Sequence, residues 1–184
     1  MLRLYLCKLN LNIAMANLKA NKLIIKKLFS NNVEDILFAI KGLRNTGNVE
    51  ILPYLITLLN ENDDKKVKNA LASFFNDIKS KKIATQIIDA IKNDKFKKIH
   101  HVLLSSCWQS NLDYSNYFNV FIDKFISGTY IDAIETLTII ENFDRKINDE
   151  EIQNSISKLK SEINNVTADK KELLVELVHV LESM

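Results

Sequence analysis

Residues 51–74 read ILPYLITLLNENDDKKVKNALASF, and this stretch contains two apolar-patterned segments joined by a polar turn. Before the turn, Leu55 and Leu59 are four residues apart, and after it Val67 and Leu71 repeat the same spacing. Side chains four residues apart lie on one face of an α-helix. The stretch therefore predicts a helical hairpin in which each helix has one apolar face.

The same hairpin pattern returns along the chain at intervals of 31 to 34 residues. The earlier segments of successive hairpins align at Ile56, Ile88, Ile122 and Ile156, at Leu59, Ile91, Phe125 and Leu159, and at Leu55, Ile87 and Phe121. The later segments align at Ala39, Ala70, Val102 and Ala133, at Ile36, Val67, Ile99 and Tyr130, at Ile40, Leu71, Leu103 and Ile134, and at Leu43, Phe74, Ser106 and Leu137. Self-similarity at this period is typical of stacked helix pairs. We predict an all-α fold, an α-α superhelix (solenoid) of about four to five stacked antiparallel helix pairs.

Turn and capping residues set the expected helix bounds, because Asn, Asp and Thr favour helix starts and Gly favours helix ends. The expected helices cover 18–29, 33–44, 49–60, 65–77, 81–92, 96–108, 114–127, 130–142, 149–163 and 169–183. The expected signals are a cap at Asn31 or Asn32 with Glu34, Pro53 in a first turn, a helix end at Gly128, and box-like starts at Thr129–Asp132, Asn148–Glu151 and Asp169–Glu172.

The domain organisation predicted from these patterns is an N-terminal extension over 1–17 followed by a repeat array over 18–184. The first 14 residues resemble a signal peptide in part, but Lys8 interrupts the apolar run, and a start at Met15 is an equal alternative. Cys7 and Cys107 form no paired spacing, which favours a reduced, cytoplasmic setting. No stretch approaches the roughly 20 apolar residues of a membrane span.

Residue patterns for catalysis, metals and cofactors are missing from the sequence. His100 and His101 are adjacent, so their side chains diverge by about 100° on a helix, and they are expected to be surface or rim histidines. Cys107 is expected to be a buried thiol. Three glycines leave no glycine-rich phosphate loop. We therefore expect no catalytic residue, no metal site, no cofactor and no enzyme activity.

Two features of the sequence are compatible with binding to a partner. Trp108 and Tyr114 flank an expected turn, where they are either packed at the rim or part of a recognition patch. Charge is also unevenly distributed: residues 1–100 carry 18 Lys and Arg against 9 Asp and Glu, whereas residues 101–184 carry 7 against 14. A net charge of +2 therefore hides a basic half and an acidic half.

Residues 51–74 resemble a HEAT-type repeat. The match is carried by Pro53, Leu55, Leu59, Asp63 or Asp64, Val67, Lys68, Ala70 and Phe74, and weaker copies extend over roughly 23–163. The chain departs from the family where Lys68 stands in place of a frequent Arg and where Val102 replaces a small residue. The resemblance implies a curved right-handed stack with the earlier helix of each pair, the B helix, on the concave side. It also implies a scaffold for other macromolecules.

Two binding functions follow from this arrangement. The leading hypothesis is a non-catalytic scaffold that binds a protein or peptide partner through the side of the B helices opposite their apolar stripe, namely Tyr54, Thr57, Gln86, Asp89, Asn119, Asp123, Asn154 and Ser157. The alternative is nucleic-acid binding, as in the HEAT-like alkylpurine DNA glycosylases, through an anion-binding edge of Lys65, Lys66, Lys81, Lys82, Lys97 and Lys98. A modifying enzyme similar to the HEAT-like bilin lyases is the third possibility, and no residue set supports it.

Overall fold

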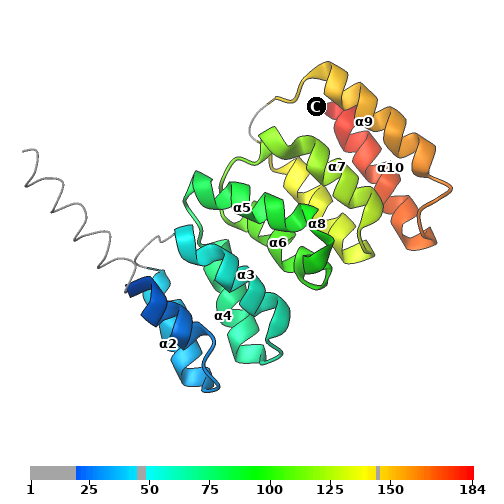
Figure 1. The fold of residues 1–184 in the computed structure, drawn as a ribbon. Coiled ribbons are helices and arrows are strands. Elements are labelled where there is room, and N and C mark those ends of the chain that lie inside the picture. The colour runs from blue at the N-terminus through cyan, green and yellow to red at the C-terminus, as the bar shows by residue number, and fades with distance from the viewer. Residues whose placement is uncertain (1–19, 45–48, 144–145) are drawn as a thin grey trace, which may run out of the picture. The chain divides into compact units, whose positions relative to one another are not determined.

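The computed structural model describes residues 20–44, 49–143 and 146–184, and within these ranges the regular secondary structure is helical with no strand (Figure 1). The expected fold class is confirmed at this level. The expected extension over 1–17 lies outside the described residues. The chain divides into two compact units, residues 1–71 and residues 72–184.

The first unit contains a helix over 20–28, α2 (Val33–Leu43), the short 3₁₀ helix η1 (Val49–Ile51), α3 (Leu52–Glu61) and the beginning of α4 (Lys65–Asn76). Asn32 caps α2, because its side chain accepts a hydrogen bond from the Glu34 amide at 2.9 Å. Pro53 lies in the first turn of α3, where its missing amide costs nothing. The core of this unit is aliphatic and includes Leu28, Ile36, Ile40, Leu55, Ile56 and Leu59.

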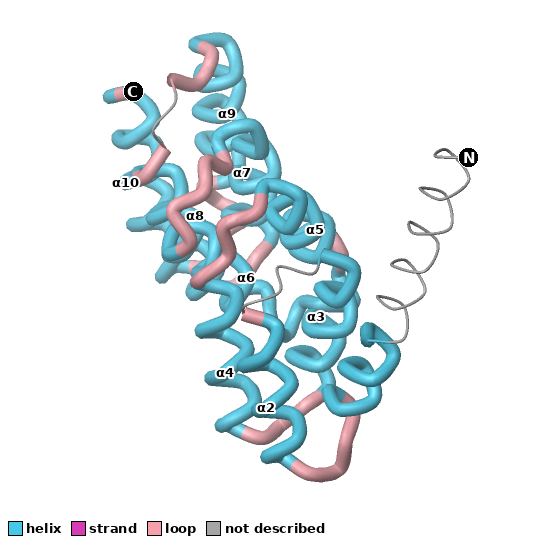
Figure 2. The backbone as a smooth tube through the Cα atoms, turned by 90° about the vertical axis from the view of Figure 1, so that its left-hand side faces the viewer, coloured by secondary structure: helices cyan, strands magenta, loops and turns pink. Residues whose placement is uncertain are grey.

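The second unit contains α5 (Lys81–Lys92), the 3₁₀ helix η2 (Asp94–Ile99), α6 (His100–Gln109), the 3₁₀ helix η3 (Ser115–Tyr117), α7 (Phe118–Ser127), α8 (Tyr130–Glu141), α9 (Asp149–Glu162) and α10 (Ala168–Ser183). α5 packs against α7, and α7 against α9. α6 packs against α8, and α8 against α10 (Figures 1 and 2). The earlier helices of the pairs are therefore neighbours of one another, and so are the later ones. No described helix combines the length and the apolar character needed to cross a membrane.

The core follows the register predicted for the B helices. Ile56, Ile88, Ile122 and Ile156 are all buried, as are Leu59, Ile91, Phe125 and Leu159. Large apolar residues that recur at one helical position in this way bury a continuous stripe along each helix. This part of the sequence prediction is confirmed in α3, α5, α7 and α9.

Among the later helices, α8 departs most from the predicted register. On α8, Ala133 and Leu137 are buried as expected, but Tyr130 is 41% exposed and Ile134 is 39% exposed. Asp132 and Thr136 are buried on the same helix instead. Both polar side chains have local partners: Asp132 forms a capping box with Thr129, and the Thr136 hydroxyl donates to the Asp132 carbonyl. Satisfied polar groups thus occupy core positions that the apolar repeat assigned to Tyr130 and Ile134.

Several expected helix starts and one expected capping box need correction. The α-helices expected from residues 49 and 114 begin at Leu52 and Phe118, because the short 3₁₀ helices η1 and η3 precede them. The helix expected from residue 96 begins at His100, because Phe96 has non-helical dihedrals within η2. α10 begins at Ala168 after an N-cap at Thr167, so Asp169 does not start the helix. Asn148 does cap α9, but Glu151 bonds to Asn119 rather than completing a box. Gly128 ends α7 as expected, with its amide bonded to the Lys124 carbonyl.

Candidate functional site

The surface expected to bind a partner lies, in the second unit, on α5, α7 and α9. Its side chains on these helices are Gln86, Asp89, Asn119, Asp123, Asn154 and Ser157. All are exposed except Gln86, which is half-buried and whose Oε1 is buried without a hydrogen-bond partner. Because the apolar stripes of these helices face the core, the polar stripes remain available to a partner. We call the five exposed residues the polar row.

The two remaining predicted residues, Tyr54 and Thr57, belong to α3 in the first unit. Tyr54 is 41% exposed and packs edge-to-face against Phe29, with ring centroids 6.5 Å apart. Thr57 is half-buried. An exposed tyrosine held by a neighbouring ring is a common anchor in protein interfaces.

Bonds between helices involve two residues of the polar row, Asn119 and Asp123, and two neighbours of the row, Thr85 and Tyr117. The Thr85 and Tyr117 hydroxyls lie 3.0 Å apart, linking α5 to η3. Asn119 donates from Nδ2 to Glu151 Oε1 at 3.1 Å, linking α7 to α9, and Lys158 forms an ion pair with Asp123. Both hydrogen bonds join residues 32 positions apart, which is one repeat length. Asn119 and Asp123 are therefore held in place by their own fold, a role that the sequence analysis did not foresee.

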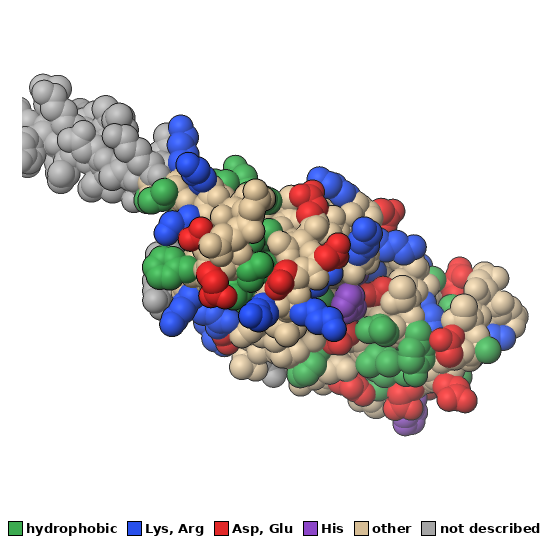
Figure 3. Space-filling model, turned by 90° about the horizontal axis from the view of Figure 1, so that it is seen from below, with side chains coloured by type: hydrophobic (Ala, Val, Ile, Leu, Met, Phe, Trp, Pro, Cys, Tyr) green, Lys and Arg blue, Asp and Glu red, His purple; other side chains and the backbone are tan. Residues whose placement is uncertain are grey.

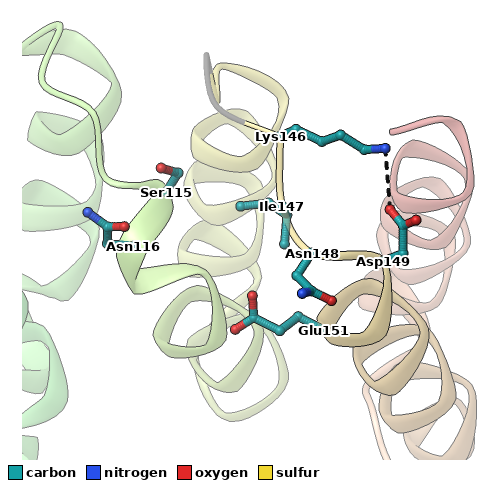
Figure 4. A pocket seen from close by; sticks show the side chains of 7 residues that line it. All are labelled: Ser115, Asn116, Lys146, Ile147, Asn148, Asp149 and Glu151. Atoms are coloured by element: carbon teal, nitrogen blue, oxygen red, sulfur yellow. Dashed lines mark ion pairs between the residues drawn. The ribbon is translucent and has the colours of Figure 1, made fainter.

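An open groove of about 590 Å³ lies beside the link between Asn119 and Glu151. Figure 4 shows Ser115 and Asn116 of η3 on one side of the groove, and the segment leading into α9 on the other. Lys146 pairs with Asp149 across 3.4 Å on the α9 side. The Ser115 Oγ is buried and has no hydrogen-bond partner. The groove is lined mainly by hydrogen-bonding groups, which suits a polar peptide better than an apolar ligand.

The lysines of the predicted anion-binding edge are all exposed. Lys65 and Lys66 open α4, Lys81 and Lys82 open α5, and Lys97 and Lys98 lie in η2. Lys97 and Lys98 therefore precede the α-helix rather than starting it. Lys65 and Lys66 belong to the first unit and the other four lysines to the second.

A buried polar cluster in the second unit was not anticipated from the sequence. His100 on α6 is 1% exposed, which corrects the expectation of a surface histidine, whereas His101 is exposed. The Nζ of buried Lys124 lies 3.3 Å from His100 Nδ1, and His100 Nε2 lies 3.2 Å from the Asn93 carbonyl oxygen. Donation from Lys124 to Nδ1 places the imidazole hydrogen on Nε2, where it is donated to Asn93. His100 is therefore held as a neutral ring.

The environment of His100 favours this neutral form. Burial, followed by the charge of Lys124, lowers the pKa of His100 below its ordinary value of 6.5. The Asn93 carbonyl and the charge of buried Asp132 act in the opposite direction and do not reverse the shift. A buried imidazole with both nitrogens engaged holds loop and helix in place and has no free nitrogen for chemistry.

Lys170 extends the buried polar cluster to α10. Its Nζ donates to the Ile126 carbonyl at 2.9 Å and to the Gly128 carbonyl at 3.0 Å. Burial lowers the pKa of Lys170, while the charges of Asp132 and Asp169 raise it. These carbonyls lie at the C-terminal end of α7, where a cation is favoured by the helix dipole. Lys170 therefore fastens the last helix to the turn between α7 and α8.

Cys107 and Tyr114 are packed in the core, whereas the ring of Trp108 is partly exposed. The Cys107 thiol is buried, as expected, and burial raises its pKa, so the thiolate is disfavoured. Tyr114 is also buried, whereas Trp108 is 37% exposed. Among the described residues, no group of three or more His, Cys, Asp or Glu side chains could hold a metal ion.

In comparisons with known proteins, no protein-family model and no curated protein matches the chain. The fold and the candidate surfaces therefore rest on the chain's own residues.

Proposed function

We propose that the chain is a HEAT-like α-solenoid that acts as a non-catalytic scaffold and binds a protein partner through the polar row. One observation carries the proposal: a polar groove of about 590 Å³ opens beside the hydrogen bond between Asn119 and Glu151. Cross-helix bonds hold Asn119 and Asp123 of the row in one arrangement before a partner arrives. Such pre-organisation lowers the entropic cost of binding.

The residues of the row suit an extended peptide or a protein loop. Asp89 and Asn154 are exposed on α5 and α9 and offer hydrogen-bonding groups on either side of α7. A polar segment of a partner would bond to these side chains while one of its own side chains enters the groove. Tyr54 is a separate candidate anchor on the first unit.

Affinity capture with matched variants tests the proposal. The row variant Asp89→Arg/Asn154→Arg places two long cations on the surface, and Glu61→Arg/Asn164→Arg makes the same charge change at exposed positions elsewhere. Partners captured from the native cell are identified by mass spectrometry after circular dichroism has verified that each variant is folded. A partner retained by the wild type and the control but lost by the row variant supports the proposal. Equal capture by all three proteins refutes it.

Nucleic-acid binding is the second candidate, and the exposure of Lys81, Lys82, Lys97 and Lys98 favours it. Asp89 and Asp123 on the polar row oppose a phosphate backbone there, so contact would be limited to the lysine groups. Backbone binding weakens steeply with salt as counterions are released. Electrophoretic shifts of duplex DNA that decrease with salt and disappear in Lys97→Glu/Lys98→Glu would establish this function. Their absence at low salt would exclude it.

A further inference from the structure

A second surface in the second unit has a different chemistry from the polar row. Ile131 is 55% exposed, Tyr130 41%, Ile134 39% and Trp108 37%. Ile131 and Ile134 are three residues apart on α8 and therefore lie on one side of that helix. Trp108 on α6 joins them, because its Nε1 donates to Glu135 Oε2 at 2.7 Å. We call Trp108, Tyr130, Ile131 and Ile134 the α8 patch.

The α8 patch is not a by-product of core packing. The opposite side of α8 is already buried through Ala133, Leu137, Ile139 and Ile140. Large apolar side chains grouped on a surface mark interaction sites more often than isolated exposed ones do. Tryptophan, tyrosine and aliphatic side chains in one group also match the composition of interface centres.

Charge around the patch is acidic. Neither α6 (HHVLLSSCWQ) nor α8 (YIDAIETLTIIE) contains Lys or Arg. Glu135 and Glu141 lie on α8, and neighbouring α10 adds exposed Glu172 and Glu176 against one exposed lysine, Lys171. Figure 3 shows exposed hydrophobic side chains, toward the right of the view, bordered by Asp and Glu. An apolar surface with an acidic border attracts a basic partner and repels an anionic lipid surface.

From this combination we infer that the α8 patch docks a basic amphipathic helix of a partner protein. Apolar side chains at helical spacing on the partner would cover Ile131 and Ile134, and flanking Lys or Arg would approach Glu141 and Glu176. This site goes beyond the polar row proposed above, since it uses other helices and an apolar rather than a polar mode of recognition. The binding proposals for the two surfaces can therefore be tested independently of each other.

The only tryptophan in the sequence lies in the patch and reports on docking directly. The probe is an 18-residue peptide of Leu and Lys with Leu at helical spacing, compared with a Leu/Glu peptide of the same pattern and with a scrambled Leu/Lys peptide. We expect the patterned Leu/Lys peptide to shift Trp108 emission to shorter wavelength in a saturable way. The other two peptides should produce no shift at the same concentration.

Variants separate this surface from the polar row. Ile131→Ser/Ile134→Ser should weaken peptide binding at least about tenfold, and so should Ile131→Lys, which changes the most exposed member of the patch. The row variant Asp89→Arg/Asn154→Arg should bind the peptide as the wild type does. The inference is overturned if the patterned peptides bind equally well, or if the patch variants retain full affinity. It is also overturned if light scattering shows a dimer that Ile131→Ser/Ile134→Ser converts to a monomer, or if anionic vesicles give the same emission shift.

Discussion

The Nζ of Lys124 on α7 lies 3.3 Å from Nδ1 of His100 on α6, and both side chains are buried. Because a second cation at His100 would face Lys124 without solvent, the folded protein resists protonation of the imidazole. The relationship makes stability depend on pH.

The sign of this dependence follows from the lowered pKa of His100. The unfolded chain takes up a proton near pH 6.5, whereas the folded protein does so only at lower pH. The unfolding free energy is therefore highest above the unfolded pKa and falls as pH decreases toward the folded value. Urea denaturation between about pH 7.5 and 5.5 should reveal this decline. His100→Gln, which can still accept from Lys124 and donate to Asn93, should flatten the curve, while His101→Gln should not. Identical curves for both variants would contradict the role of His100.

Lys170→Met should destabilise the second unit. The substitution keeps an unbranched apolar stem but removes the donor to the Ile126 and Gly128 carbonyls. Leaving buried carbonyls unsatisfied costs about 1–3 kcal/mol. Thermal unfolding by circular dichroism measures the effect, and Lys171→Met at the exposed neighbouring position should be nearly neutral. Equal melting temperatures for the two variants would show that Lys170 does not fasten α10.

Gly128→Ala and Gly42→Ala should have opposite effects. A Cβ at Gly128 would lie 2.7 Å from both Asp132 Cβ and the Lys124 carbonyl oxygen, while at Gly42 nothing lies within 4 Å. Crowding at Gly128 should cost about 1–3 kcal/mol. Gly42 is helical and uncrowded, so alanine there should add roughly 0.5–1 kcal/mol. Chemical denaturation measures the change in unfolding free energy for each variant. Stabilisation by Gly128→Ala would disprove the steric argument.

Ile88→Asp should unfold the second unit, because Ile88 is 2% exposed on α5. Removing the side chain from the core and burying a carboxylate should cost more than about 3 kcal/mol. Lys82→Asp, at an exposed position in the first turn of the same helix, is the control and should not destabilise the protein, because the helix dipole favours a carboxylate there. A soluble Ile88→Asp protein with an unchanged melting temperature would refute the register of the B helices.

Helix positions were predictable because their determinants are local. Apolar spacing located the helices, and residues such as Asn32, Thr129 and Gly128 marked their bounds. The B-helix stripe was also predictable, since Ile88 and its equivalents need only a buried face. The exposure of the polar row followed from the same periodicity. The cross-helix bonds of the polar row could not be predicted from the periodicity, because they depend on which helices become neighbours.

The buried polar cluster could not be predicted for the same reason. Lys124 and His100 are 24 residues apart, and nothing in the sequence identifies them as partners. The exposure of Tyr130 and Ile134 was missed because the apolar repeat treats every polar residue as solvent-facing. Thr129 and Asp132 satisfy each other locally, which allows a carboxylate to be buried on α8. The capping box formed by Thr129 and Asp132 is the sequence signal that could have revealed that the buried face of α8 differs from the predicted one.

The attachment of Lys170 to the turn after α7 also bears on how the chain is made. Lys170 follows its two carbonyl partners by 44 and 42 residues, so the lysine is added to the growing chain, and leaves the ribosome, after that turn. During synthesis, water must satisfy the Ile126 and Gly128 carbonyls until α10 has emerged. We therefore expect translation arrested ahead of Lys170 to yield a protease-sensitive intermediate, and the C-terminal helix to be the element that completes folding.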